Sequence, residues 1–417
     1  MRLQHFGEAV RIGTDTPPNG AFPMSVDPKS LVRRSPFPPS ASQPVVTPIY
    51  PSVVYRSASP DALDDQYEGR SQGYSYAREG HPNADILAAK IDWMEQAEGG
   101  IITGSGMAAI SAAFLACLKA GDHVVAGDQL YGRSLRLLAE DLPRLGITAT
   151  LADPTDAAAF EAAIKPNTRA ILVEVVSNPT LRIADMQAIA AIARRHGLRL
   201  IVDNTFTTPR GYQPFLHGAD IVIHSVTKLL AGHSDVTLGY VAAKDAGLQK
   251  RLLDAIVTWG LTPSPYECWL AERGLYSFEL RFDRAQDNAR QLADALAGLP
   301  GVAAVLYPGR LDHPDHNRAA SVLGQNFGNM LSFRLTGGRA AANALTKAAP
   351  HIAFAPTLGD IGTTLSHPAS SSHRALTAEG RAALGITEGF FRVSVGIEAI
   401  DQLVSEFTTA IAAAAKA

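Results

Sequence analysis

The chain is poor in cysteine and in charge, and each shortage excludes a class of protein. Its 417 residues include two cysteines, Cys117 and Cys268, which form no CxxC pair. We therefore expect neither a disulfide framework nor a cysteine-bound zinc site, and a reducing cytoplasm suits such a chain. Charged residues make up 18% of the sequence. This is below the roughly 25% usual for soluble domains, which favours a large core.

An excess of charge of one sign is also missing. The 37 Lys and Arg residues nearly balance the 40 Asp and Glu residues, for a net charge of −3. Such a chain lacks the electrostatic footprint of a protein that binds nucleic acid or an anionic membrane. The N-terminal stretch MRLQHFGEAVRIG has no apolar region or cleavage site of a signal peptide. Residues 99–118 are uncharged, but Gly, Ser, Thr and Ala dominate them, so we exclude a membrane span there. We expect a cytoplasmic protein.

Proline is concentrated near the N-terminus. Eight of the 26 prolines fall within the first 44 residues, a stretch without apolar periodicity. We interpret residues 1–75 as an extended N-terminal arm. Such an arm is either disordered or wrapped on a neighbouring subunit.

From about residue 83, short apolar runs alternate with Ala-rich helical stretches such as 184–196, which precedes a C-cap glycine, Gly197. The expected strands are 123–128, 147–151, 170–176, 198–203, 219–225 and 238–243. Because these runs are apolar at nearly every position, they predict a mostly parallel α/β sheet covered by helices on both faces. The active site should then lie at the carboxyl ends of the strands. We expect a large domain over residues 76–275 and a smaller α/β domain over 276–417.

A glycine-rich loop, Gly104–Ala109, follows one short apolar run and opens a helix. Backbone N–H groups at a helix start can hold a phosphate. The spelling also fits a dinucleotide-binding turn, with Asp128 as the ribose-binding acid, which would suit a nicotinamide-dependent dehydrogenase. A purely structural turn is the third reading of the loop.

Two polar residues end neighbouring apolar strands. Lys228 lies beside Ser225 and Thr227, where partial burial would lower the pKa of its amine and make it a nucleophile or base. A solvated lysine at a helix start is the alternative. Asp203 could pair with a cationic group or merely cap a turn. A phosphate loop, a lysine and an acid together are what pyridoxal phosphate requires, whereas a nicotinamide cofactor would use only the loop.

The sequence resembles the cystathionine lyase and synthase family of pyridoxal-phosphate enzymes, the Cys/Met metabolism family. The resemblance runs from about Gln43 to the C-terminus. It is carried in order by the motifs YAREGHPN (76–83), GSGMAAI (104–110), LYGR (130–133), SNPT (177–180), VDNTF (202–206), HSVTKLLAGHSD (224–235) and FRVSVGIE (391–398). The resemblance implies the aspartate-aminotransferase-like fold, fold type I, with a seven-stranded sheet. It also implies a homodimer with shared active sites, usually within a tetramer.

The resemblance also implies a role for each site residue. Lys228 would hold the cofactor as an imine and act as the base, Tyr131 would stack on the pyridine ring and serve as an acid, and Asp203 would pair with the ring nitrogen. The implied phosphate ligands are Gly106, Met107, Ser225 and Thr227, with Tyr76 and Arg78 reaching in from the neighbouring subunit. The implied substrate-binding residues are Arg392, Asn178 and Thr357, the first of them a guanidinium fork for the substrate carboxylate.

The resemblance implies γ-elimination from a methionine- or cystathionine-like amino acid. The alternative within the family is γ-replacement, by an O-acyl-homoserine sulfhydrylase or a cystathionine γ-synthase. Pro356 stands where members that process cystathionine carry a glutamate, which gives a slight preference for a small thioether substrate. His313 and His316 form an HxxH without a third ligand, so we expect no metal.

Overall fold

The computed structural model describes residues 40–374 and 376–417. The chain divides into two compact units, Met1–Val46 and Thr47–Ala417. Residues 40–46 of the first unit contain no helix or strand. The prolines of the expected arm that precede Pro44 lie outside the described residues, so the arm stays a prediction. All features below belong to the second unit.

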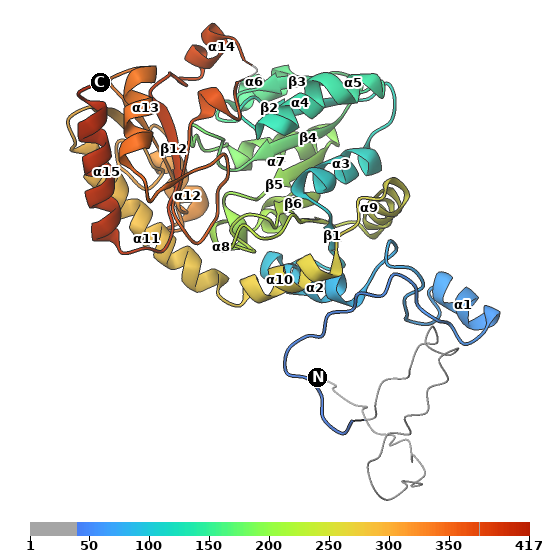
Figure 1. Ribbon diagram of the computed structural model, residues 1–417. Helices are drawn as coiled ribbons and strands as arrows, with labels where there is room; N and C mark the ends of the chain where they lie inside the picture. Colours follow the sequence, from blue (N-terminus) through green and yellow to red (C-terminus); the bar gives the residue numbers. More distant parts are fainter. Residues whose placement is uncertain (1–39, 375) are drawn as a thin grey trace, which may run out of the picture. The chain divides into compact units, whose positions relative to one another are not determined.

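A seven-stranded sheet dominates the N-terminal two thirds of this unit (Figure 1). Its strands are β1 (Ile101–Thr103), β2 (His123–Gly127), β3 (Thr148–Ala152), β4 (Thr168–Glu174), β5 (Arg199–Asp203), β6 (Ile221–Ser225) and β7 (Gly239–Ala243). They lie in the order β1-β7-β6-β5-β4-β2-β3. Strands β2 to β6 pair in parallel, and β7 runs antiparallel to both β1 and β6. The predicted mostly parallel seven-stranded sheet is confirmed.

Helices bury both faces of this sheet. Along β4, Ile171 and Val173 pack into one core, and Ala170 and Leu172 pack into another on the opposite face. This arrangement explains why the strand is apolar at successive positions. The helical segments of this part are α1 (Pro60–Tyr67), α2 (Pro82–Glu95), α3 (Gly106–Cys117), α4 (Gly132–Arg136), η2 (Leu137–Asp141), α5 (Leu142–Arg144), α6 (Ala157–Ala162), α7 (Met186–His196), α8 (Thr208–Gly211), η3 (Pro214–His217), α9 (Ala246–Trp259) and α10 (Pro265–Leu275).

Helix α7 shows how local sequence sets an element's limits. The Asp185 side chain accepts a hydrogen bond from the Ala188 N–H and caps the start. Gly197 ends the helix in a left-handed conformation with φ of 63°, which glycine adopts without strain. The predicted helix over 184–196 therefore begins two residues later than expected and ends where expected.

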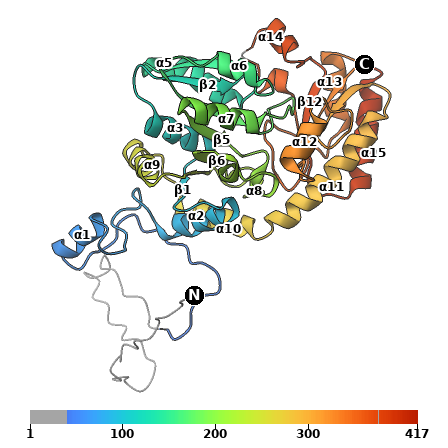
Figure 2. The same cartoon turned by 180° about the vertical axis from the view of Figure 1, so that it is seen from behind.

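A second sheet has five strands in the order β10-β11-β12-β9-β8 (Figure 2). These are β8 (Val302–Leu306), β9 (Met330–Leu335), β10 (Ala353–Phe354), β11 (Thr364–Ser366) and β12 (Phe390–Ser394). The helical segments of this part are α11 (Phe278–Ala297), α12 (His316–Leu323), α13 (Arg339–Ala348), η4 (Pro368–Ser370), α14 (Ala378–Ala383) and α15 (Ile400–Ala414). Helices α11, α13 and α15 cover the sheet around a core that includes Phe333, Phe391 and Phe407. The domain limits at 75/76 and 275/276 stay predictions.

The uncharged stretch 99–118 forms β1 and α3. None of the helices in residues 40–374 and 376–417 has the length and apolar character to cross a membrane.

Candidate active site

The carboxyl ends of three parallel strands bring the predicted polar residues together. Asp203, the last residue of β5, pairs in register with Glu174, the last residue of β4, and with Ile223 on β6. Ser225 ends β6, and Lys228 follows three residues later. Parallel strands end at one edge of a sheet, so these side chains share the edge where α/β proteins bind ligands.

Asp203 is held by its own loop. The Thr205 hydroxyl donates to Asp203 Oδ1 at 2.6 Å, and the Thr205 N–H donates to the same oxygen at 3.1 Å. Burial raises the pKa of Asp203, and these two hydrogen bonds and nearby His224 oppose that rise. The second oxygen, Oδ2, makes no hydrogen bond within the described residues. Asp203 is therefore oriented by one oxygen, and the other can meet a cation.

The phosphate loop lies against the end of β6. A Cβ added at Gly106 would come within 2.7 Å of Ser225 Cβ and 2.9 Å of its Oγ, so only glycine fits. The Ser105 hydroxyl caps α3 by accepting from the Ala108 N–H at 3.0 Å. The first N–H groups of the helix, those of Gly106 and Met107, have no intrahelical partner. The structure thus brings Gly106 and Ser225 together.

Thr227 lies on the same turn, but its hydroxyl is already paired. It donates to the Leu238 carbonyl at 3.1 Å and accepts from the Leu238 N–H at 3.0 Å. The Met107 side chain points away from the loop, and its sulfur accepts from the Ser134 hydroxyl at 3.9 Å. Only the backbone of Met107 is thus suited to a phosphate.

Lys228 is largely buried at the sheet edge. The backbone N–H of Lys228 donates to the Ser225 carbonyl at 3.1 Å, and this hydrogen bond closes a tight turn after β6. Burial lowers the pKa of the amine, and the positive charge of Arg392 lowers it further. A lowered pKa increases the neutral fraction of the amine near pH 7, and the neutral amine is the form that attacks carbonyls and accepts protons.

Arg392 lies in the middle of β12 and is buried. Its Nη1 donates to Asn178 Oδ1 at 2.7 Å, and its Nη2 donates to the Thr357 carbonyl at 3.0 Å. Its Nε is buried without a partner among the described residues. Burial lowers the pKa of Arg392 to about 10, against the raising effect of Glu174 and Tyr131. The structure brings together all three predicted substrate-binding residues, and Nε is the one guanidinium nitrogen without a partner among the described residues.

Tyr131 follows β2 and is 44% exposed. Its backbone N–H donates to Glu174 Oε1 at 2.7 Å. Glu174 was not among the predicted site residues. A single carboxylate inside the apolar run AILVEVV was the available signal, since a buried Glu needs a reason to be there.

Arg281, on α11, was missed as well. Its guanidinium donates to the carbonyl oxygens of Leu229, Leu230 and Gly274 at 2.8 to 3.0 Å. Two of these carbonyls belong to the residues directly after Lys228. Arg281 thus fixes the turn that carries the lysine, and nothing in its local sequence indicated this.

Tyr76 and Arg78 lie on an exposed loop. The Arg78 guanidinium stacks over the Tyr76 ring, 5.3 Å from its centroid, and Nη1 donates to the Val257 carbonyl at 3.5 Å. Tyr76 forms an isolated β-bridge with Val54. No hydrogen bond within the described residues ties either side chain to the residues at the strand ends.

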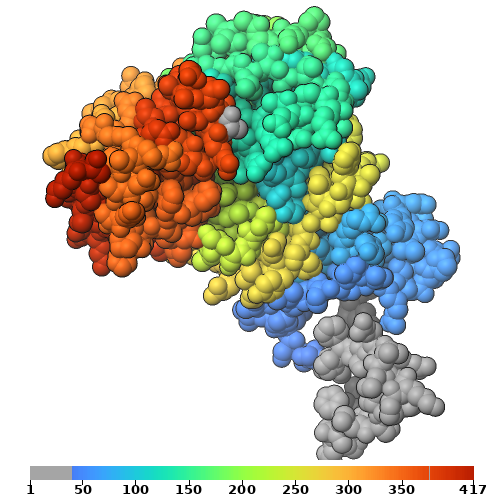
Figure 3. All heavy atoms as spheres, turned by 45° about the horizontal axis from the view of Figure 1, so that its top comes forward, coloured from blue at the N-terminus to red at the C-terminus, as the bar shows by residue number. Residues whose placement is uncertain are grey.

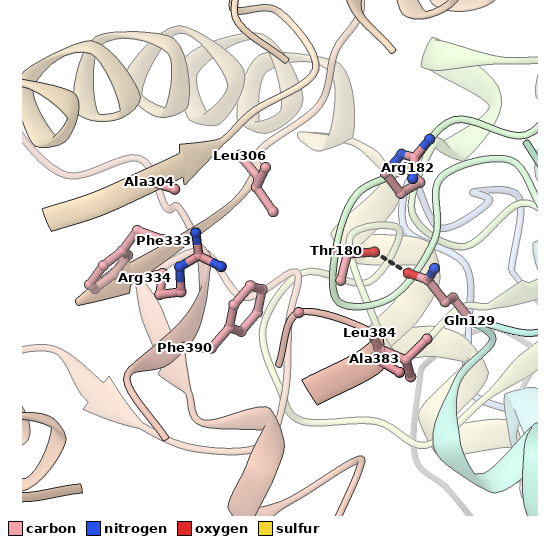
Figure 4. A pocket seen from close by; sticks show the side chains of 11 residues that line it. Gln129, Thr180, Arg182, Ala304, Leu306, Phe333, Arg334, Ala383, Leu384 and Phe390 are labelled. Atoms are coloured by element: carbon pink, nitrogen blue, oxygen red, sulfur yellow. Dashed lines mark hydrogen bonds between the residues drawn. The ribbon is translucent and has the colours of Figure 1, made fainter. Parts of the chain in front are cut away.

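The C-terminal part of the chain, drawn in orange to red, lies directly against the part drawn in green (Figure 3). A cavity of about 240 Å³ opens between them, where Arg334 and Phe390 face Gln129 and Thr180 (Figure 4). Gln129 and Thr180 bond to each other. They are chain neighbours of Tyr131 and Asn178, but none of the predicted site residues lines this cavity. Among the described residues, no group of three or more His, Cys, Asp or Glu could hold a metal.

The residues fit pyridoxal phosphate by three independent features. The Gly106 position admits no side chain, one oxygen of the Asp203 carboxylate has no hydrogen bond to the described part of the chain, and Lys228 is largely buried with a lowered pKa. These residues would supply hydrogen-bond donors to the phosphate, a partner for the pyridine nitrogen and an amine for the aldehyde.

Comparisons with known proteins support this fit. The family described as "Cys/Met metabolism PLP-dependent enzyme" matches residues 30–412. An L-methionine gamma-lyase from Porphyromonas gingivalis is 36% identical, over 87% of this chain and 91% of the relative. A cystathionine gamma-lyase from Bacillus subtilis is 38% identical, over 88% of this chain and 94% of the relative.

The fold comparison agrees. The crystal structure of a cystathionine gamma synthase from Xanthomonas oryzae pv. oryzae superimposes with a TM-score of 0.84 at 36% identity, covering 89% of this chain and 93% of that one. The fold type I architecture inferred from the sequence is confirmed. The chain belongs to the Cys/Met metabolism family of pyridoxal-phosphate-dependent enzymes.

Proposed function

We propose that this enzyme is a carbon–sulfur lyase that catalyses γ-elimination from a methionine- or cystathionine-like amino acid. With methionine and water as reactants, the products are 2-oxobutanoate, ammonia and methanethiol. The observation that carries the proposal is the buried Arg392 guanidinium, which lies close enough to Lys228 to lower the pKa of the lysine and whose Nε has no partner in residues 40–374 and 376–417. A carboxylate clamp beside a reactive amine suits an α-amino acid.

The chain's own residues divide the work. Arg392 and Asn178 bind the substrate carboxylate, and Thr357 orients Arg392 through its carbonyl. Bound pyridoxal phosphate withdraws electrons from the substrate Cα. Asp203 keeps positive charge at the pyridine nitrogen. Lys228 accepts the Cα proton and then moves protons at Cα and Cβ.

Tyr131 is the proposed acid that protonates the leaving sulfur. Its ring is 44% exposed, so it can meet a substrate that enters from solvent. If a thiol or sulfide adds in place of water, the same residues catalyse γ-replacement, the alternative function. Similarity to both lyases and a synthase is consistent with either outcome.

A substrate panel tests the proposal. The purified enzyme would be assayed with methionine, cystathionine, homocysteine and O-acyl-homoserines, each with and without sulfide, for 2-oxo acid and ammonia. Formation of 2-oxo acid from a thioether without sulfide supports the lyase. Product formed only from acylated homoserine with sulfide would make the replacement function correct.

We further propose that the protein forms a homodimer with shared active sites and that two such dimers form a tetramer in the cytoplasm. Support comes from exposed apolar side chains between residues 49 and 76, where a monomer would place few. They are Ile49, Tyr50, Val53, Val54, Tyr67 and Tyr76. In this arrangement Tyr76 and Arg78 would bind the phosphate of the neighbouring site.

Mixing experiments test the shared site. Lys228→Ala and Arg78→Ala subunits are each expected to be nearly inactive alone. Refolding them together should restore up to about a quarter of wild-type activity, since a mixed dimer regains one intact site. No restoration, with mixed dimers confirmed by mass spectrometry, would contradict sharing.

A further inference from the structure

Glu174 is a buried carboxyl group whose presence the proposed reaction does not explain. It is 7% exposed at the end of β4, in register with Asp203 on β5. Neighbouring strands lie about 4.8 Å apart, and side chains in register point to the same face. Two carboxyl groups are thus adjacent, that of Glu174 buried and that of Asp203 partly exposed.

The two carboxyl groups have different partners. Asp203 Oδ1 accepts two hydrogen bonds, from the hydroxyl and the N–H of Thr205. Glu174 Oε1 accepts one, from the Tyr131 N–H at 2.7 Å, and its Oε2 is buried without a partner in the described part of the chain. Hydrogen bonds to a carboxylate favour its ionised form. Asp203 is therefore better stabilised as the anion.

The charges around Glu174 support this assignment. Burial raises its pKa well above the usual range, and the negative charge of Asp203 raises it further. Arg392 and the Tyr131 N–H oppose these effects but are the smaller contributions. A neighbouring negative charge disfavours ionisation of a buried carboxyl group. Glu174 is the more buried and the less hydrogen-bonded of the two, so it is the group that retains a proton more readily.

We propose that Glu174 is a positioning residue that acts as a neutral acid: Oε1 fixes the backbone of Tyr131, whose ring would stack on the cofactor, and the proton on Oε2 leaves Asp203 as the single anion available to the pyridine nitrogen. This assignment gives Glu174 a role through Tyr131 and Asp203 without contact to the reacting atoms. The assignment of Glu174 rests on the proposed function only in the experiments that measure turnover. The presence of the cofactor follows from membership of the family.

The test compares Glu174→Gln with Glu174→Met. Glutamine keeps a carbonyl acceptor for Tyr131 and carries no charge, as the neutral acid does. Methionine has a similar size without the acceptor. Glu272→Gln is the matched control. Glu272 lies on α10 and is also buried, but it accepts hydrogen bonds from the Thr47 and Tyr276 hydroxyls.

Two readouts apply: the visible circular dichroism of the bound cofactor, and kcat/KM for whichever amino acid is turned over. Glu174→Gln should keep the dichroism, the pH profile and kcat/KM within about threefold of wild type. Glu174→Met should weaken the dichroism and lower kcat/KM by about tenfold to a hundredfold. In a Tyr131→Ala background, Glu174→Met should lower kcat/KM little further, because the effects of coupled residues are not additive.

Equal losses in Glu174→Gln and Glu174→Met would overturn the proposal, since the negative charge would then be what matters. Wild-type behaviour of Glu174→Met would overturn it as well, by showing that Tyr131 needs no such support. Because the dichroism needs no substrate, an enzyme with no thioether lyase activity would refute the proposed function and leave this test intact.

Discussion

The two halves of the active site are held in different ways. In the cofactor half, the key residues have local contacts: Thr205 orients Asp203 from two residues away, and the Lys228 backbone N–H bonds to the Ser225 carbonyl. Arg281 supports the lysine turn from a more distant helix. In the substrate half, Arg392 reaches Asn178 across 214 residues of sequence. The cofactor half is therefore built by strand ends and turns, whereas the substrate half depends on how the two sheets pack. We expect changes to the first to stop all reactions and changes to the second to alter which substrate reacts.

The largest effect is expected in the cofactor half. Lys228→Ala should lower kcat by about 10⁴-fold or more with every substrate, because both the amine that holds the cofactor and the proton carrier are lost. Steady-state kinetics would measure the loss, and equilibrium dialysis should show that the cofactor still binds in part. Lys244→Ala, at an exposed lysine, is the control. A fully active Lys228→Ala enzyme would refute the assignment.

The support of the lysine turn should matter next. Arg281→Met leaves the carbonyls of Leu229, Leu230 and Gly274 without their donors. We expect the free energy of unfolding to fall by about 3 kcal/mol, with faster loss of cofactor. Urea unfolding would measure the change, with exposed Arg284→Met on the same helix as control. Equal free energies of unfolding of the two variants would show that the turn is stable without Arg281.

In the substrate half, Arg392→Lys should raise KM and lower kcat/KM by about tenfold to a hundredfold, because lysine cannot form the same fork of hydrogen bonds. The visible spectrum of the cofactor should not change. Arg334→Lys on the neighbouring strand is the control. A variant with altered cofactor spectrum and unchanged KM would contradict the separation of the two halves.

The smallest effect is expected at Pro356, which is exposed on the loop before Thr357. Pro356→Glu should favour cystathionine over methionine by at most about fivefold, the value of an exposed ion pair with the distal ammonium. Ratios of kcat/KM would measure this preference. Pro356→Gln removes the proline ring without adding a charge and is the control. An equal change of substrate preference in both variants would show that the added charge is not its cause.

The sequence predicted the first sheet and the cofactor half because both depend on neighbours in the chain. Runs such as 198–203 are apolar on both faces; Asp203 ends one such run, and Lys228 follows three residues after the end of another. The residues that support them from a distance were missed: Arg281 reaches its three carbonyls from α11, and Glu174 becomes meaningful only beside Asp203 on the next strand. In the second sheet, β10 and β11 are too short to show a periodicity.

The substrate-binding residues show what spacing in the sequence alone cannot predict. Arg392, Asn178 and Thr357 were predicted by resemblance to a family. Spacing alone could not have joined them, because their contacts form only when the second sheet packs on the first. The roles of these residues, as of Tyr76 and Arg78, remain predictions.

The central claim is that Lys228 holds the cofactor at the edge of the first sheet. Treatment of the purified enzyme with borohydride should shift its visible absorption band and fix the cofactor to the protein. Peptide mass spectrometry should then find the reduced pyridoxyl group on Lys228, in the peptide that contains SVTK. A label on another lysine, or a protein that stays colourless and unlabelled after reconstitution with pyridoxal phosphate, would contradict the account.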